Sequence, residues 1–196
     1  MRMLICDNMA LCTDAEVQRL LPLVSAQRRE TALRYKHTFG QWATLQSWLM
    51  LRELGLPDEP WSFNEYGKPY LPDGPYFSLS HCKAGIAVAM DTQPIGIDIE
   101  SYRDVSPELI EHTMNQAEQD LIHASDDPIR TFTELWTRKE AYVKYLGTGL
   151  AAAGFNFDLG TAGLPGNPRQ YLDNTKGANI VSTTTKNYAY SICTKQ

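Results

Sequence analysis

Residues 93–100 hold two acidic side chains whose spacing suits metal binding. The segment is Gln-Pro-Ile-Gly-Ile-Asp-Ile-Glu, and its apolar alternation predicts a strand. Successive side chains of a strand point to opposite faces, so Asp98 and Glu100 lie on the same face. Two carboxylates on one face could supply some of the oxygen ligands that a hard cation requires. Taken alone, the spacing favours a solvated strand face over a metal site.

Residues 136–144, Trp-Thr-Arg-Lys-Glu-Ala-Tyr-Val-Lys, hold the second set of reactive side chains. Trp136, Glu140 and Lys144 recur every four residues and therefore share one stripe of a helix. If this stripe faces the acidic strand, three carboxylates meet beside an ammonium group. That arrangement suits Mg²⁺ together with an anionic group such as phosphate.

The remaining pattern predicts the elements that position these two segments. Strands are expected over residues 3–6, 61–70, 77–80, 86–90, 95–100, 155–157, 179–184 and 188–193. A long helix is expected over 25–54 and the signature helix over 128–146, with helix N-caps at Thr13, Ser106, Asn115 and Asp127 and a C-terminal stop at Gly147. The turn-like residues 91–94 predict a hairpin between the strands at 86–90 and 95–100.

Composition places the chain among ordinary globular proteins. Hydrophobic residues make up 43% and charged residues 21% of 196 residues, and no apolar run is long enough to cross a membrane. The net charge of −5 argues against a general nucleic-acid binder. Four cysteines without a Cys-x-x-Cys pair, and no secretion signal, predict reduced thiols in a cytoplasmic protein.

The two segments, taken together, resemble the signature of the 4′-phosphopantetheinyl transferases. That signature is a Gly-hydrophobic-Asp element followed, some forty residues on, by Trp-x-x-Lys-Glu-x-x-x-Lys. Here the elements are residues 96–98 and 136–144, and the Gly-Lys-Pro at 67–69 and the Ser-His at 80–81 also match. The resemblance is strongest over residues 63–150, and the length of the chain implies the larger, pseudodimeric, surfactin-synthetase-activating type.

The resemblance implies an α+β fold. Two similar α/β halves, 1–100 and 101–196, would be related by a pseudo-twofold axis, with the active site in the cleft between them. The implied reaction moves the phosphopantetheine arm of coenzyme A to a serine of an apo acyl or peptidyl carrier protein and releases adenosine 3′,5′-bisphosphate. The implied cofactor is Mg²⁺, with Mn²⁺ as an alternative, and the implied state is a monomer that binds neither membrane nor nucleic acid.

The same resemblance assigns candidate roles to individual residues. The metal ligands are Asp98, Glu100 and Glu140, and the catalytic residues are Glu140, as the base directly or through a metal-bound water, and Lys144. Contacts with coenzyme A are expected from Arg28, Lys68, Pro69, Ser80, His81, Lys139 and Lys144. Structural alternatives stay open for two of these residues. Lys139 is equally compatible with a surface lysine, whereas Lys68 could serve turn chemistry alone, although the resemblance favours its contact with the nucleotide end.

One departure from the family concerns the 3′-phosphate of coenzyme A. The family usually has an arginine early in the long helix of the first half, where this chain has Gln-Trp-Ala-Thr at 41–44. Arg28, Arg34 or Lys36 could substitute from the preceding turns, and an arginine placed at Ala43 should sharpen recognition. The departure leaves open a degenerate enzyme with weakened affinity for coenzyme A. The alternatives to the transferase are a non-catalytic module that binds coenzyme A or a carrier protein and, less favoured, a metal-dependent nucleotide hydrolase.

The surface that receives the carrier protein is also undecided by the sequence. Leu109, Ile110 and Met114 give the predicted helix after residue 106 an apolar face. This face is equally compatible with a docking surface and with a place in the core.

Overall fold

The computed structural model describes residues 1–149, 154, 157, 159, 169–173 and 177–196, and it shows an α+β fold. One antiparallel sheet has the order β1-β5-β4, with β1 (Arg2–Cys6), β5 (Gly85–Asp91) and β4 (Tyr76–Cys82). A second has the order β6-β9-β8-β7, with β6 (Ile95–Ser101), β9 (Tyr188–Lys195), β8 (Ala178–Thr184) and β7 (Arg169–Asp173). A short hairpin joins β2 (Ser62–Phe63) to β3 (Pro69–Tyr70).

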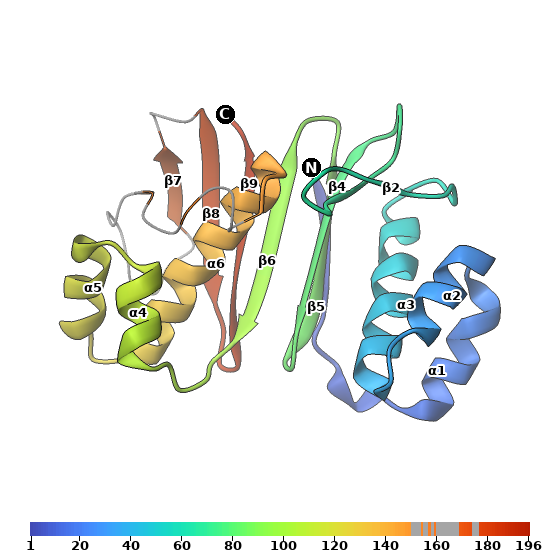
Figure 1. Ribbon diagram of the computed structural model, residues 1–196, viewed down its shortest axis with the longest axis horizontal. Coiled ribbons are helices and arrows are strands. Elements are labelled where there is room, and N and C mark those ends of the chain that lie inside the picture. Colours follow the sequence, from blue (N-terminus) through green and yellow to red (C-terminus); the bar gives the residue numbers. More distant parts are fainter. Residues whose placement is uncertain (150–153, 155–156, 158, 160–168, 174–176) are drawn as a thin grey trace.

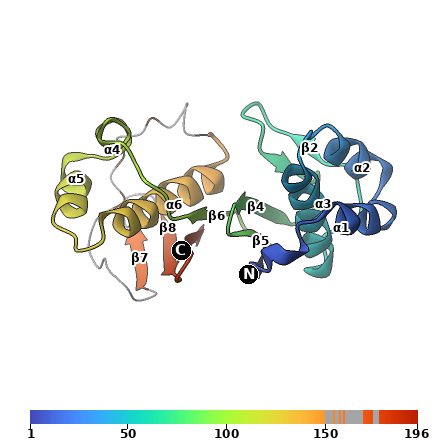
Figure 2. The same ribbon diagram turned by 90° about the horizontal axis from the view of Figure 1, so that it is seen from below.

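The helices lie on the outer sides of the two sheets (Figure 1). The three-stranded sheet carries α1 (Asp14–Leu20), α2 (Ala26–Leu33) and α3 (Thr38–Glu53). The four-stranded sheet carries α4 (Pro107–Thr113), α5 (Gln116–His123) and α6 (Pro128–Leu146). Short 3₁₀ turns cover Met9–Leu11 and Leu21–Leu23. Seen from below, β4 and β6 lie side by side between the two groups of helices (Figure 2).

Alternation along the central strands explains how the sheets fit together. In β5, Ile86 and Val88 pack into the core beneath α1–α3, whereas Ala87 and Ala89 face the other sheet. These small side chains leave room for the apolar face of β6. The opposite face of β6 is thereby turned toward α6.

The helix boundaries follow the predicted capping residues. The side chains of Thr13, Ser106, Asn115 and Asp127 each accept a hydrogen bond from a backbone N–H in the first turn of their helix. Gly147 ends α6 in the left-handed region, with φ of 75°. These predictions are confirmed.

Two predictions of secondary structure are wrong. The helix expected over 25–54 is two helices, because the chain turns at 34–37, where Tyr35 packs on Gly40 and its carbonyl accepts from the Gln41 amide. The hairpin expected between β5 and β6 does not form. Instead these strands belong to different sheets, and the Ile97 N–H donates to the Ser78 hydroxyl of β4 at 3.1 Å.

Two further expectations concern the second half. Met114 is buried in the core with Ile122, Phe132 and Leu135, so it is unavailable for docking a carrier protein. The strand expected over 155–157 falls largely outside the described residues.

Candidate active site

The site begins where β6 crosses α6 without a side chain between them. A Cβ built on Gly96 would lie 2.0 Å from the Ala141 carbonyl oxygen and 2.4 Å from the Tyr145 nitrogen, both in the backbone of α6. Only glycine permits this approach, because backbone atoms of a helix cannot move aside. The close approach sets Asp98, two residues further along β6, against the stripe of α6 that carries Glu140 and Lys144.

Three polar groups meet at the centre of the site. The Lys144 ammonium lies 2.6 Å from Asp98 Oδ1 and donates to the Ser80 hydroxyl at 2.9 Å. The Ser80 hydroxyl donates to the same Asp98 oxygen at 2.7 Å. Strand β4, strand β6 and helix α6 each supply one of these groups, so the triangle forms only in the folded chain.

The second oxygen of Asp98 makes the site fit a cation. Asp98 is 2% exposed, and its Oδ2 has no hydrogen-bond partner among the described residues. Burial, followed by the Asp98 charge, raises the pKa of Glu100 to about 7 and also raises that of Glu140. Three carboxylates that repel one another, one of them with an unpaired oxygen, are ligands of the type that a hard cation takes. In the described part of the chain, however, no three acidic, histidine or cysteine side chains are arranged closely enough to hold a metal ion.

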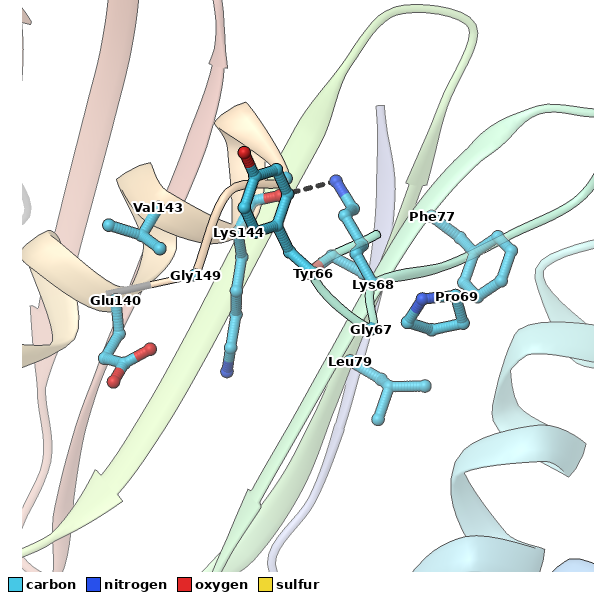
Figure 3. A pocket seen from close by; sticks show the side chains of 12 residues that line it. Tyr66, Gly67, Lys68, Pro69, Phe77, Leu79, Glu140, Val143, Lys144 and Gly149 are labelled. Carbon is cyan, nitrogen blue, oxygen red and sulfur yellow. Dashed lines mark hydrogen bonds between the residues drawn. The ribbon is translucent and has the colours of Figure 1, made fainter. Parts of the chain in front are cut away.

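A cavity of about 250 Å³ opens beside this triangle. Tyr66, Lys68, Pro69, Phe77 and Leu79 line one side, and residues of α6 line the other. Figure 3 shows Lys68 reaching the end of α6, whereas Lys144 and Glu140 both project from α6 away from that end. The cavity is largely apolar with charged groups at one edge, as is typical of small-molecule sites.

His81 follows Ser80 at the end of β4 and lies at the edge of the site. Its ring contacts Phe39 edge-on, with 5.6 Å between the ring centroids. His81 is exposed as a whole residue, yet partial desolvation of the ring and then the Lys144 charge lower its pKa. A neutral imidazole at neutral pH can accept or donate a hydrogen bond to a ligand.

Lys139 does not face the cavity. It has no exposed surface, and its ammonium group lies 2.6 Å from Glu118 and donates to the Thr113 carbonyl at 2.9 Å. Glu118 also accepts a hydrogen bond from the Asn115 N–H. Through Glu118 and Thr113, Lys139 therefore joins α5 and α4 to α6. The buried position of Lys139 does not support a contact with coenzyme A. Although the next residue, Glu140, lines the cavity, neighbouring residues of a helix point in different directions.

Arg28 and Ala43 are also buried, which corrects two expectations. The Arg28 guanidinium lies 3.2 Å from the centre of the Trp61 ring and 4.7 Å from that of Trp48, and burial lowers its pKa to about 10. Arg28 is 4% exposed, so its position does not support contact with a phosphate. Ala43 has no exposed surface, and an arginine there would disrupt the core beneath α1–α3 instead of sharpening recognition. By contrast, Arg34 is exposed.

Comparison with known proteins agrees with this geometry. The family model of the 4′-phosphopantetheinyl transferase superfamily matches residues 94–193, just over half of the chain. This chain belongs to the 4′-phosphopantetheinyl transferase superfamily. The matched segment contains β6, α6, β8 and most of β9, and it therefore includes every predicted metal ligand.

Individual relatives of this superfamily member come from bacteria and yeast. It is 33% identical over 147 residues to the 4′-phosphopantetheinyl transferase Sfp of Bacillus subtilis, with 69% of this chain and 66% of the relative covered. It is 30% identical over 137 residues to enterobactin synthase component D of Salmonella typhimurium, covering 68% and 56%. It is 27% identical over 151 residues to the L-aminoadipate-semialdehyde dehydrogenase-phosphopantetheinyl transferase of Saccharomyces cerevisiae, covering 68% and 56%. These matches span just under two thirds, or less, of the relatives' own lengths.

One contact at the edge of this site has no clear signal in the sequence. Asn64, in the β2–β3 hairpin, donates from its side chain to the Gly147 carbonyl at 2.7 Å. The only signal was an asparagine three residues before Gly67 in a turn, which indicates local turn chemistry and not a distant partner. Among the described helices of this superfamily member, none is long and apolar enough to span a membrane.

We expect Glu100→Gln to stabilise the metal-free protein at pH 8 but not at pH 4.5. A raised folded-state pKa means that the stability contribution of Glu100 is present below its unfolded pKa and is lost as pH rises through about 7. Glutamine removes this loss, which corresponds to ~1–3 kcal/mol at pH 8. Urea unfolding in the presence of a chelator measures it, with the exposed Glu111→Gln as control. An equal gain at both pH values would contradict the buried carboxylate cluster.

Proposed function

We propose that this protein transfers the 4′-phosphopantetheine arm of coenzyme A to a serine of an apo carrier protein and releases adenosine 3′,5′-bisphosphate. The observation that carries the proposal is the triangle of Lys144, Asp98 and Ser80 beside Glu100 and Glu140, at the edge of the cavity. Phosphoryl transfer needs positioned positive charge and little other chemistry from the protein. Lys144 can supply part of that charge, and a divalent cation held by the carboxylates would supply the rest.

Asp98, Glu100 and Glu140 would hold the divalent cation, Mg²⁺ or Mn²⁺. When bound, the cation would reduce the repulsion between the pyrophosphate and the attacking oxygen. Lys144 would leave Asp98 in part and donate to the pyrophosphate, because its side chain is 28% exposed at the cavity edge. Ser80 would keep Asp98 oriented during this exchange.

Glu140 is the proposed general base. It faces the cavity, and burial together with the Asp98 charge raises its pKa. A raised pKa makes a carboxylate a better acceptor for the proton of the attacking serine hydroxyl at neutral pH. General-base assistance of this kind typically contributes ~10²–10⁴-fold to the rate.

The nucleotide end of coenzyme A is proposed to occupy the cavity beneath the β2–β3 hairpin. Pro69, Phe77 and Leu79 offer apolar contacts there, while Ser80 and His81 lie next to the charged edge. Lys68 lines the same cavity, but its ammonium group is engaged with backbone carbonyls. We therefore assign nucleotide contact to the hairpin backbone and Pro69, and not to the charge of Lys68.

The cleft is proposed to lie between two related halves, residues 1–100 and 101–196. Support comes from the repeated strand order, in which β1-β5-β4 of the three-stranded sheet corresponds to β6-β9-β8 of the four-stranded sheet, although β6 itself lies almost wholly within residues 1–100. In both halves the helices that cover the sheet come between its first strand and the next long strand. A chain that contains both halves would act as a monomer.

Intact-mass analysis tests the proposed function. Apo acyl and peptidyl carrier proteins would be incubated with this protein, coenzyme A and Mg²⁺, and a mass gain of one phosphopantetheine group is expected. A control carrier with its acceptor serine replaced by alanine should gain nothing. Coenzyme A binding without any mass gain would instead support the non-catalytic binding module.

The buried Trp42 and Ala43 predict weak recognition of the 3′-phosphate. Neither side chain can donate a charge-assisted hydrogen bond, which would contribute ~1.5–3 kcal/mol. We expect kcat/KM to be only about tenfold higher for coenzyme A than for dephospho-coenzyme A, since ~1.4 kcal/mol is one decade. A preference of several hundredfold would show that other residues, such as the exposed Arg34 and Lys36, enclose the phosphate.

A further inference from the structure

The C-terminal end of α6 is capped by residues of the other half of the protein. The last four carbonyls of an α-helix lack partners within the helix. In α6 the Lys144 carbonyl accepts from the Lys68 ammonium, and the carbonyl of Gly147, just beyond the helix, accepts from the Asn64 side chain at 2.7 Å. Both donors come from the β2–β3 hairpin. A positive charge at this end of a helix is also favourable to the helix dipole.

The hairpin that supplies these donors is held in shape by Asn64 itself. Its side-chain oxygen accepts from the N–H groups of Tyr66 at 3.0 Å and Lys68 at 2.8 Å, and its own N–H donates to the Lys68 carbonyl at 3.0 Å. Gly67 takes φ of 82°, which suits glycine in a tight turn. Asn64 therefore both closes the turn and binds the end of α6 through a hydrogen bond.

Lys68 also joins α6 to the start of β6. Its ammonium group donates to the Ile95 carbonyl at 3.1 Å as well as to the Lys144 carbonyl. The side chain of Lys144 reaches Asp98 on that same strand at 2.6 Å. Lys144 is thus held at its backbone by Lys68 and at its ammonium group by Asp98.

The space at this contact is filled. A Cβ added to Gly147 would lie 3.3 Å from the Asn64 side-chain nitrogen and 3.4 Å from Lys68 Cδ. Burial lowers the pKa of Lys68 to about 8, and two of its three possible donors are occupied by carbonyls. The charge of Lys68 is therefore directed mainly at the protein.

We propose that Asn64 and Lys68 form a clip that fixes the end of α6 and so positions the Lys144 ammonium group for the transfer reaction. The inference rests on the proposed function and deepens it, since it makes Lys68 a positioning residue that acts through Lys144. Neither clip residue needs to touch the pyrophosphate. Because Lys68 also lines the cavity, the geometry of Lys144 is linked to the loop beside the proposed nucleotide site.

A double-mutant cycle between the clip and Lys144 tests the proposal. We expect Lys68→Met to lower kcat about tenfold with less than a twofold change in the Kd for coenzyme A, measured by calorimetry. In a Lys144→Ala background, the same substitution should change the single-turnover rate less than twofold, because the group that it positions is gone. Equal factors in both backgrounds would overturn the proposal, as would a large rise in Kd with kcat unchanged, which indicates direct ligand contact.

Two further variants keep the test independent of one substitution. Asn64→Ala breaks the clip at its other donor and should show the same dependence on Lys144, including in the event that Lys68→Met does not fold. Lys83→Met, at an exposed lysine in the turn between β4 and β5, is the matched control and should leave kcat unchanged.

Hydrogen exchange separates a failure of the clip from a failure of the proposed function. Amides at the end of α6, residues 143–147, should exchange at least tenfold faster in Lys68→Met than in Lys83→Met, without any substrate present. Unchanged exchange would overturn the clip whatever the activity. A third outcome is faster exchange in Lys68→Met when the original protein transfers phosphopantetheine to no carrier. The clip would then hold α6 as described, but the transferase function and the role of the clip in catalysis would both be refuted.

Discussion

Replacing Asp98 or Glu140 by alanine is expected to abolish most phosphopantetheine transfer. Asp98 is the buried partner of Lys144 and offers an unpaired oxygen to a cation, and Glu140 is the proposed base. We expect a loss of at least ~10²-fold in kcat for each, in line with removal of a general base or a preorganised electrostatic group. Intact-mass kinetics at saturating Mg²⁺ measure the loss.

Controls separate lost chemistry from lost folding. Asp98→Asn keeps the size of the buried side chain, and the exposed Asp104→Ala removes a carboxylate just beyond β6. Glu100→Gln should cost a smaller factor, because water can replace one ligand of the cation. Calorimetry with Mg²⁺ should show weaker binding to Asp98→Asn than to Asp104→Ala. Near-normal turnover by Asp98→Ala or Glu140→Ala would refute this assignment.

Among substitutions of a glycine by alanine, Gly96→Ala is expected to lower stability and transfer the most. The new Cβ would lie within 2.4 Å of two backbone atoms of α6, so the helix must move away from β6. Overpacking of this kind costs ~1–3 kcal/mol and sometimes more. The shift would also separate Lys144 and Glu140 from Asp98, so both stability and transfer should fall.

Urea unfolding and intact-mass kinetics together test this expectation. The comparison variant is Gly40→Ala, where the new Cβ would lie 2.6–2.9 Å from the side chain of Tyr35, its Cβ included. Gly40→Ala should also cost ~1–3 kcal/mol of stability, but it should leave transfer by the folded protein nearly unchanged, because the clash is with Tyr35 and not between β6 and α6. A Gly96→Ala protein with the stability and activity of the original chain would show that the contact between β6 and α6 is less tight than described.

The sequence by itself determined the local elements and their reactive faces. Alternation placed Asp98 and Glu100 on one face of β6, and four-residue spacing placed Glu140 and Lys144 on one stripe of α6. Capping residues located the starts of the predicted helices, because the physics of a helix end involves only near neighbours in the chain. The Gly-x-Asp motif was also visible, although the reason for its glycine was not.

Tertiary structure decided which of these faces meet and which basic residues are available. Lys139 and Lys144 differ little in sequence context, but one is buried against Glu118 and the other reaches Asp98. Arg28 is stacked against two tryptophans, and Lys68 is bonded to carbonyls more than twenty-five residues away. The hairpin expected between β5 and β6 failed for the same reason, since strand pairing depends on distant partners. Long-range packing sets these outcomes, and a local pattern carries no information about it.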